Sequence, residues 1–429
     1  MSISQSLSNA VSGLNAASRM AEVVASNTAN ALTEGYAKRE IRLGAQVLGG
    51  NGAGVRVLSV DRMVNEGLRS DLRLAAVLES ADAIATHLNS VSRNLQETRI
   101  DADQQIAKQI DFLNDTLTQI DDLNATILAE RASGHDANAL LDQRQALVDQ
   151  VSQIVPVRQV ARENDQIALF TTGGAILLEG TPARIGFTPT GIITADMTEN
   201  GGALSGLTLN GMEISSADER VMGGGTLGAL FAIRDEIAPD AQSQIDAYAR
   251  DLIGRFSDPA LDPTLASGVP GLFTDNGGPA DPLSETGLAS RIEINARADP
   301  AQGGALWRLR DGLGAIAPGP VGNSEHLSAL VDALARESLP VSGDFGPSLR
   351  SSSGLAADLL SRVSTARQSA QSREIFSATR HETLNTMALS EGVDTDQEMQ
   401  NLLRVEELYA ANARVIQTVD ALIQQLLEL

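Results

Sequence analysis

The C-terminal stretch NLLRVEELYAANARVIQTVDALIQQLLEL, residues 401–429, repeats mostly apolar side chains at alternating intervals of three and four residues. This C-terminal seam consists of Leu402, Val405, Tyr409, Asn412, Ile416, Val419, Ile423 and Leu426. The spacing is that of a heptad repeat and predicts one long helix with a narrow apolar stripe. A lone helix cannot bury such a stripe, so we expect the C-terminal helix to pack against a partner.

The N-terminus carries the same spacing. This N-terminal seam consists of Leu7, Ala10, Leu14, Ala17, Ala21, Val24 and Thr28, on a helix expected from residue 3 to about residue 30. The simplest partner for either terminal helix is the other one, or the same helices of neighbouring copies. Chains with association helices at both ends are typical subunits of a polymer, so the pattern favours an assembly protein over a protein built around a pocket.

Composition narrows the function classes. The 429 residues are 42% hydrophobic but only 3% aromatic, with a net charge of −23 and no cysteine. Cores must therefore be built from Leu, Ile, Val and Ala, which suits long helices. The negative charge argues against binding to nucleic acid and to anionic membranes, and the absence of cysteine excludes disulfides and zinc–sulfur sites. No apolar run is long enough for a membrane span and no cleaved secretory signal is apparent, so we expect a cytoplasmic protein or one exported without such a signal.

Between the termini the periodicity changes twice. We predict an α+β fold, an elongated multi-domain rod with paired, coiled-coil-like terminal helices, a helical middle domain and a β-rich insert. The expected domains are an inner domain of residues 1–62 and 388–429, a middle domain of residues 63–154, 223–256 and 325–387, a β-rich insert of residues 155–222, and a loop-rich segment of residues 257–324 that leaves the outer domain reduced or absent.

Local patterns give finer expectations. A hairpin is expected from strands at 37–43 and 55–60 around a glycine-rich tip, followed by helical structure to residue 149 interrupted at Gly134. The insert should hold short strands, at residues 157–160, 166–170, 175–178, 184–187 and 192–195, and a hairpin at 207–214 with an Asn-Gly turn. Residues 257–324 should be extended, with one strand near 291–295.

Polar residues on the predicted helices are expected to face solvent. Thr116, Asp121 and Asn124 lie off the apolar stripe of the long helix. In the segment ALLDQRQALV, residues 139–148, the pattern buries the leucines and the valine, and exposes Asp142 and Arg144.

Motifs for catalysis, cofactors and metals are weak. The run GGNGAG, residues 49–54, joins two predicted strands and is followed by no Gly-Lys-Ser/Thr, so we interpret it as a hairpin tip instead of a phosphate loop. Gly223–Gly225 is interpreted as a hinge. The four histidines have no metal-ligand spacing, and no G-x-S-x-G elbow occurs. We therefore expect no enzyme activity, cofactor or metal, although a pair of acids acting as a glycosidase stays open.

Several motifs in series resemble one protein family. SNTANALTEGY, residues 26–36, is similar to the N-terminal signature of rod, hook and hook-associated proteins of the bacterial flagellum. LLDQR, residues 140–144, and GALFAIRDE, residues 228–236, resemble segments of the hook-associated protein 1 family. SEGVDTDQEM, residues 390–399, and YAANARVI, residues 409–416, resemble that family's C-terminal helix. The resemblance covers both ends and the helical core, about two-thirds of the chain.

The resemblance implies a structural protein at the junction between hook and filament, located in the extracellular flagellum. Its partners would be further copies of itself in a ring, the hook protein, the second junction protein, and an export chaperone on the C-terminal helix. Alternatives are a hook subunit, the second junction protein or, from another class, a wall-degrading hydrolase. The expected assembly and chaperone surface comprises Leu7, Leu14, Val24, Asn30, Gly35, Tyr36, Leu402, Val405, Tyr409, Asn412, Ile416, Val419, Ile423 and Leu426.

Overall fold

The structure is a computed structural model that describes the whole chain except residues 1–2, 49–50, 215–222, 391, 393–394 and 428–429. It is a mixed α+β fold, rich in helix, with small sheets and long terminal helices. Contacts between Cα atoms divide it into two compact units, Met1–Ser353 and Gly354–Leu429. No helix within the described residues is long and apolar enough to cross a membrane.

The chain begins with a helix and a hairpin, as the sequence predicts. Helix α1 is Ile3–Ala29, and strands β1, Arg39–Leu48, and β2, Asn51–Arg62, pair in antiparallel orientation. The strands are longer than expected because pairing continues to Leu48 opposite Asn51. Residues 49 and 50 of the predicted glycine-rich tip lie outside the described residues.

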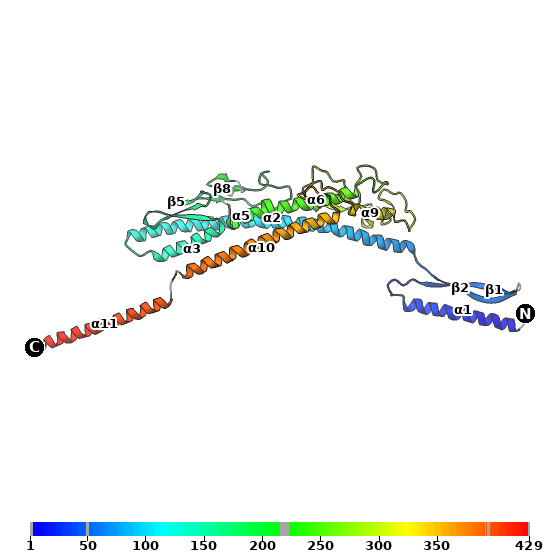
Figure 1. The fold of residues 1–429 in the computed structure, drawn as a ribbon, viewed down its shortest axis with the longest axis horizontal. Helices are drawn as coiled ribbons and strands as arrows, with labels where there is room; N and C mark the ends of the chain where they lie inside the picture. The colour runs from blue at the N-terminus through cyan, green and yellow to red at the C-terminus, as the bar shows by residue number, and fades with distance from the viewer. Residues whose placement is uncertain (1–2, 49–50, 215–222, 391, 393–394, 428–429) are drawn as a thin grey trace. The chain divides into compact units, whose positions relative to one another are not determined.

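A single helix of 67 residues organises the rest of the first unit. This helix, α2 at Glu66–Ala132, starts where the Asn65 side chain accepts a hydrogen bond from the Leu68 amide. It ends near Gly134, whose φ is +76°, before helix α3 at Asn138–Ile154. Helix α5, Gly225–Ala232, a π-helical turn, Ile233–Ile237, and helix α6, Ala238–Phe256, then run beside α2 (Figure 1).

The β-rich insert follows α3. Its elements are β3 at Val157–Ala161, the short helix η1 at Glu163–Asp165, β4 at Ile167–Thr171, β5 at Ile176–Glu179, β6 at Thr181–Pro182, β7 at Ile185–Gly186, β8 at Leu207–Leu209 and β9 at Met212–Ile214. Strands β3 to β6 form one antiparallel sheet and β7 to β9 another. The Asn210–Gly211 turn has positive φ at both residues, as an Asn-Gly hairpin requires.

One predicted strand is wrong. Residues 192–195 form no strand, because their backbone turns to meet the helices: the carbonyl of Thr194 accepts a hydrogen bond of 3.0 Å from the Arg99 side chain. The glycine run at 223–225 packs closely against α3, and its use as a hinge stays a prediction. A Cβ at Gly225 would lie 2.2 Å from the Ile154 carbonyl oxygen, so glycine there permits close packing against the end of α3.

The first core lies between α2, α3, α5 and the insert, and it contains polar residues that we expected in solvent. Thr116 and Asn124 on α2 are buried, and so is Arg144 on α3. The Arg144 guanidinium donates to Asn124 Oδ1 at 2.8 Å and to the Asp165 carbonyl at 2.6 Å, while Asn124 donates to the Ile167 carbonyl at 3.1 Å. Burial is possible because these groups bond one another and the strand backbone.

The second core corrects the expectation of an extended segment at 257–324. Here β10 at Phe273–Asp275 pairs with β11 at Ile292–Ile294, where a strand was expected, and the short helices are α7 at Leu288–Arg291, η3 at Pro300–Gln302 and α8 at Arg308–Asp311. Helix α9, Glu325–Ala335, follows this segment at the start of the predicted helical region 325–387. Apolar residues of this segment pack against α6 and the first half of α2. The segment escaped sequence analysis because side chain to backbone bonds, not regular periodicity, hold it.

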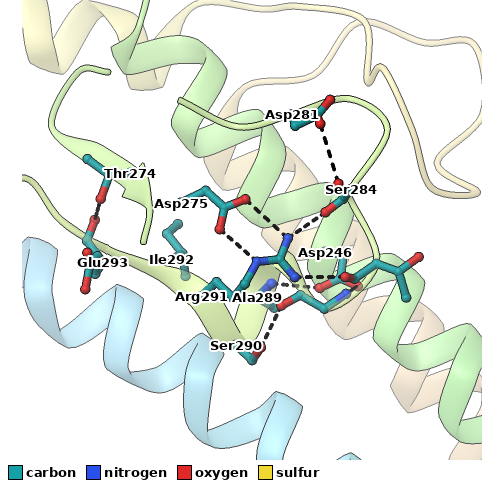
Figure 2. A network of polar contacts seen from close by, with 12 residues as sticks. Asp246, Thr274, Asp275, Asp281, Ser284, Ala289, Ser290, Arg291, Ile292 and Glu293 are labelled. Carbon is teal, nitrogen blue, oxygen red and sulfur yellow. Dashed lines mark hydrogen bonds and ion pairs between the residues drawn. The ribbon is translucent and has the colours of Figure 1, made fainter. Parts of the chain in front are cut away.

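Asp246 on α6 shows how such bonds work (Figure 2). Its carboxylate accepts hydrogen bonds of 2.7 Å from the amides of Gly287 and Ala289. Arg291 then forms an ion pair with Asp275 at 2.8 Å and donates to the Ser284 carbonyl. Two side chains thereby fix a loop that forms few ladder hydrogen bonds of its own.

The second unit is helical. Helix α10 spans Ser352–Ser390 and helix α11 spans Thr395–Leu427. The domain boundaries expected from the sequence stay predictions, and so does the pairing of the terminal helices.

Candidate assembly surface on the terminal helices

The N-terminal seam lies on the exposed side of α1. Leu7, Leu14 and Val24 are 65%, 72% and 62% exposed, and the alanines and threonine between them are exposed as well. Apolar side chains left in water at helical spacing indicate a surface that is completed by a partner.

The opposite side of α1 faces the hairpin and is small and polar. The residues that are at least partly buried there are Asn9, Ser12, Gly13, Ala16, Val23, Ser26, Asn27 and Asn30. Ser12 Oγ accepts from the Val55 amide at 3.1 Å, and a Cβ at Gly54 would lie 2.0 Å from the same oxygen. The hairpin therefore approaches α1 closely through small residues and leaves the apolar side of the helix free.

Two residues of the N-terminal signature, Asn27 and Tyr36, join the end of α1 to the start of the hairpin. Asn27 Oδ1 accepts from the Tyr36 hydroxyl and from the Arg39 amide, both at 2.9 Å, and Asn27 Nδ2 donates to the Arg39 carbonyl at 2.8 Å. The Tyr36 hydroxyl also lies 3.2 Å from Ser26 Oγ. We call this network the Asn27–Tyr36 latch. It sets the direction in which the chain leaves the helix.

Asn30 and Gly35 shape the connection between α1 and β1. Asn30 follows the last helical residue, and its side chain donates to the Ser26 carbonyl at 2.9 Å. Gly35 has a positive φ of +79°. It lies six residues beyond the helix, however, and is the third residue of a turn closed by the Tyr36 amide and the Thr33 carbonyl at 3.1 Å. The glycine thus serves a β-turn that aims Tyr36 back at α1 and is not the C-terminal cap of the helix.

The C-terminal seam is exposed along the described part of α11. Exposed fractions run from 48% at Val419 to 79% at Tyr409, with Leu402, Val405, Ile416 and Ile423 between them, and Asn412 is exposed too. The side chain of Leu426 lies outside the described residues. Leu408, Val415 and Leu422 widen the apolar side of the helix. The structure therefore brings Asn30, Gly35 and Tyr36 together, and leaves both seams without a described partner.

A second polar site was missed from the sequence. Arg234, in the π-helical turn, is fully buried and pairs with Asp103 at 2.7 Å and Asp235 at 2.8 Å. Arg99 donates to the carbonyls of Arg234, at 2.8 Å, and Met197, at 2.6 Å. Burial lowers the pKa of Arg99. Burial also opposes charge on Arg234, but the hydrogen bonds that Arg234 donates to Asp235 and Asp103 raise its pKa above the ordinary value. Only the segment GALFAIRDE, already singled out, could have pointed to this position.

Comparisons with known proteins agree with the sequence motifs. The family model described as the flagellar hook-associated protein FlgK helical domain matches residues 70–259, and that described as the flagellar basal body rod FlgEFG protein C-terminal matches residues 388–429. The flagellar hook-associated protein 1 of Bacillus subtilis (strain 168) is 21% identical over 373 residues, which are 82% of this chain and 71% of the relative.

A solved structure, that of the flagellar hook junction protein FlgK from Burkholderia pseudomallei, is 21% identical and aligns with a TM-score of 0.37. The alignment covers 49% of this chain and 40% of that one. The two family models lie at the helical body and the C-terminal helix, where LLDQR, GALFAIRDE and YAANARVI occur, and the curated relative spans most of the chain. By this evidence the chain is similar to the flagellar hook-associated protein 1 family, and the similarity supports a structural role at the junction between hook and filament.

Proposed function

We propose that the chain acts as a structural subunit of the hook–filament junction that associates through the N-terminal and C-terminal seams. We call the region from α2 to α9, with the β-rich insert, the body. The observation that carries the proposal is the exposure of both seams at the two ends of a chain whose body has its own packed cores. Similarity to the family implies assembly with other flagellar components and a place in the flagellum. The family resemblance implies no catalytic activity.

The specific partners belong to this proposal. Copies of the chain would form a ring by pairing α1 with α11, with the hook protein on one side and the second junction protein on the other. Two narrow seams suit this task, because each gains stability only when another helix covers it. Purified monomer should accordingly lose residues 395–429, and residues 1–35, to limited proteolysis before the body is cut. Resistance at both ends would contradict association-coupled ordering.

An export chaperone is the other proposed partner of α11. The apolar side of this helix is wide as well as exposed, and such a surface favours a covering protein before assembly. Within Thr395–Leu427, five acidic residues outnumber two arginines, whereas helices that lie on membranes favour basic residues. We propose that the chaperone covers the C-terminal seam in the cytoplasm and that the chain leaves through the flagellar secretion system without a cleaved signal.

The decisive experiment introduces charge into the seam. Ile416→Asp with Ile423→Asp should abolish chaperone binding and junction assembly, because carboxylates cannot be buried unpaired between helices. Circular dichroism and thermal melting of the body should not change. A matched control, Thr418→Asp with Ala421→Asp, adds the same charge on the outer side of α11 and should assemble. Unfolding of the body by the first pair would show that the seam is internal core.

Electron microscopy of cells that lack the chain tests the place of the protein. Bare hooks and filament protein secreted into the medium are expected, since the filament then has no surface on which to polymerise. Intact filaments would contradict the junction role and favour another axial function.

A further inference from the structure

Basic residues gather at the base of the hairpin. Strands β1 and β2 place Arg39 directly opposite Arg62, and Lys38 precedes Arg39. Residues directly opposite each other share one side of an antiparallel pair, and like charges there are destabilising. Nothing among the described residues forms an ion pair with these three side chains, whereas Arg42 pairs with Asp61 at 3.3 Å. We call Lys38, Arg39 and Arg62 the basic hairpin patch.

The contacts that these arginines do make leave their charge unneutralised. The Arg39 guanidinium lies 5.4 Å from the centre of the Tyr36 ring, and Arg62 donates to the Gly35 carbonyl at 3.2 Å. Both contacts hold the side chains beside the signature turn. The result is a positive surface, positioned by the Asn27–Tyr36 latch, in a chain whose net charge is −23.

Acidic residues of matching placement occur on α11. In the heptad that begins at Leu402, Glu406 and Asp420 occupy the same flanking position, beside the C-terminal seam, and both are exposed. Residues at this position form ion pairs between helices in coiled coils. Helix α1 provides no further basic partner for Glu406 and Asp420, because its one basic residue, Arg19, already pairs with Glu22 at 3.0 Å. The basic partner of this flank must therefore come from outside α1.

Consider the α1 whose seam an α11 covers. The hairpin attached to that α1 is poorly placed to form ion pairs with the same α11. It packs on the side of α1 opposite the N-terminal seam, so an α11 seated on that seam lies across the full helix from it. A helix with its side chains is about 10 Å wide, whereas an ion pair requires approach within about 4 Å. The hairpin consequently faces a different α11.

We propose that the basic hairpin patch docks the acidic flank of α11 from a neighbouring copy of this chain. This rests on the proposed function and adds to it a second contact. The seam would take one C-terminal helix, and the hairpin on the back of α1 would take the next, so that each N-terminal helix and hairpin connects two copies. Such a second contact between copies would reinforce the ring that the helix pairs form.

Arg39→Glu separates docking from hairpin stability. It replaces a like-charged cross-strand pair by an opposite one, so the hairpin itself should become more stable, while the net charge of the patch falls from +3 to +1. If the patch docks α11, the fraction of cells that carry filaments should fall about tenfold. Glu406→Arg in the same chain should restore that fraction. Glu407→Arg, one residue along on the outer side of α11, should not restore it. Normal filaments with Arg39→Glu, or equal rescue by Glu407→Arg, would overturn the proposal.

Cross-linking distinguishes a neighbouring copy from the same chain, and the absence of native cysteine makes it clean. A chain with Arg62→Cys and Glu406→Cys, in isolated flagella treated with a short bis-maleimide, should give a ladder of dimers and larger species. Internally linked monomer alone would overturn the proposal. So would no product while a seam pair, Leu14→Cys with Ile416→Cys, does link. Failure of the seam pair as well would instead contradict the proposed function.

Discussion

The helical body and the terminal helices differ in which side chains they bury and which they expose. The body buries charge: Arg99, Asp103, Arg234 and Asp246 are 0–1% exposed and all have hydrogen-bond partners. Helix α11 exposes aliphatic residues such as Ile416 at 69%. Buried charge is tolerable only in a fully formed network, and exposed aliphatic stripes are useful only when covered later. The body is therefore packed as a single chain, and the exposed ends agree with the proposed association.

Arg234→Ala should have the largest effect on the body. It would leave Asp103 buried without its guanidinium partner, which costs about 3 kcal/mol or more, because the carboxylate cannot reach water. Thermal melting of the purified chain measures the loss. Arg19→Ala, in an exposed ion pair of α1, is the matched control and should change the free energy of unfolding by less than about 0.5 kcal/mol. Equal losses of unfolding free energy in the two variants would contradict the difference between the body and the terminal helices.

Ile120→Ala should come next. Ile120 on α2 is fully buried in the first core, and truncation of such a residue leaves a cavity that costs about 2–5 kcal/mol. Denaturant unfolding followed by circular dichroism gives the value. A cost below about 1 kcal/mol would show that the body repacks easily and is less complete than its burial indicates.

Asp246→Ala should destabilise the second core by about 2 kcal/mol, since it removes the acceptor of two buried amides. Burial also raises the pKa of Asp246 above its ordinary value of 3.8. The folded state then holds this proton more tightly than the unfolded state, so the stabilising contribution is complete below pH 3.8 and is lost as pH rises through the folded pKa. Asp246→Asn, which does not titrate, should lack that fall in a pH series of unfolding midpoints. An identical pH series in both proteins would contradict the raised pKa.

Gly35→Val should affect the N-terminal helix and hairpin alone. A β-branched residue at φ of +79° costs about 1 kcal/mol or more, and it would misplace Tyr36 in the latch. Hydrogen exchange should quicken in α1 and the hairpin and stay unchanged in the body. Swimming should be lost while export continues. Normal motility would show that the turn is incidental.

Ile416→Ala should have the smallest effect on stability. It is the same substitution as Ile120→Ala, made at an exposed position of α11, and the unfolding free energy of monomer should move by less than about 0.5 kcal/mol. Assembly should nevertheless weaken. A loss comparable to that of Ile120→Ala would place the C-terminal seam inside the folded monomer.

Periodicity was informative wherever one side of an element meets one environment. The spacing of Leu7, Leu14 and Val24 predicted α1, and the Asn-Gly pair at residue 210 predicted the β8–β9 hairpin, because both depend on neighbours in sequence. The seam residues were selected by the same rule, and their exposure agrees with a partner surface, whereas Asn30, Gly35 and Tyr36 were selected from the N-terminal signature motif. Their contacts in an assembly stay a prediction.

The sequence by itself determined the long helices, the seams at the two ends and the resemblance to a flagellar family, since these follow from local spacing and short motifs. Only the tertiary structure decided which polar residues are buried. Arg144, expected in solvent, lies against Asn124 from another helix and against the Asp165 backbone; the segment after residue 257 folds because Asp246 satisfies its amides. A buried polar group is stable only with partners in place, and those partners are distant in sequence, so no local pattern could reveal them.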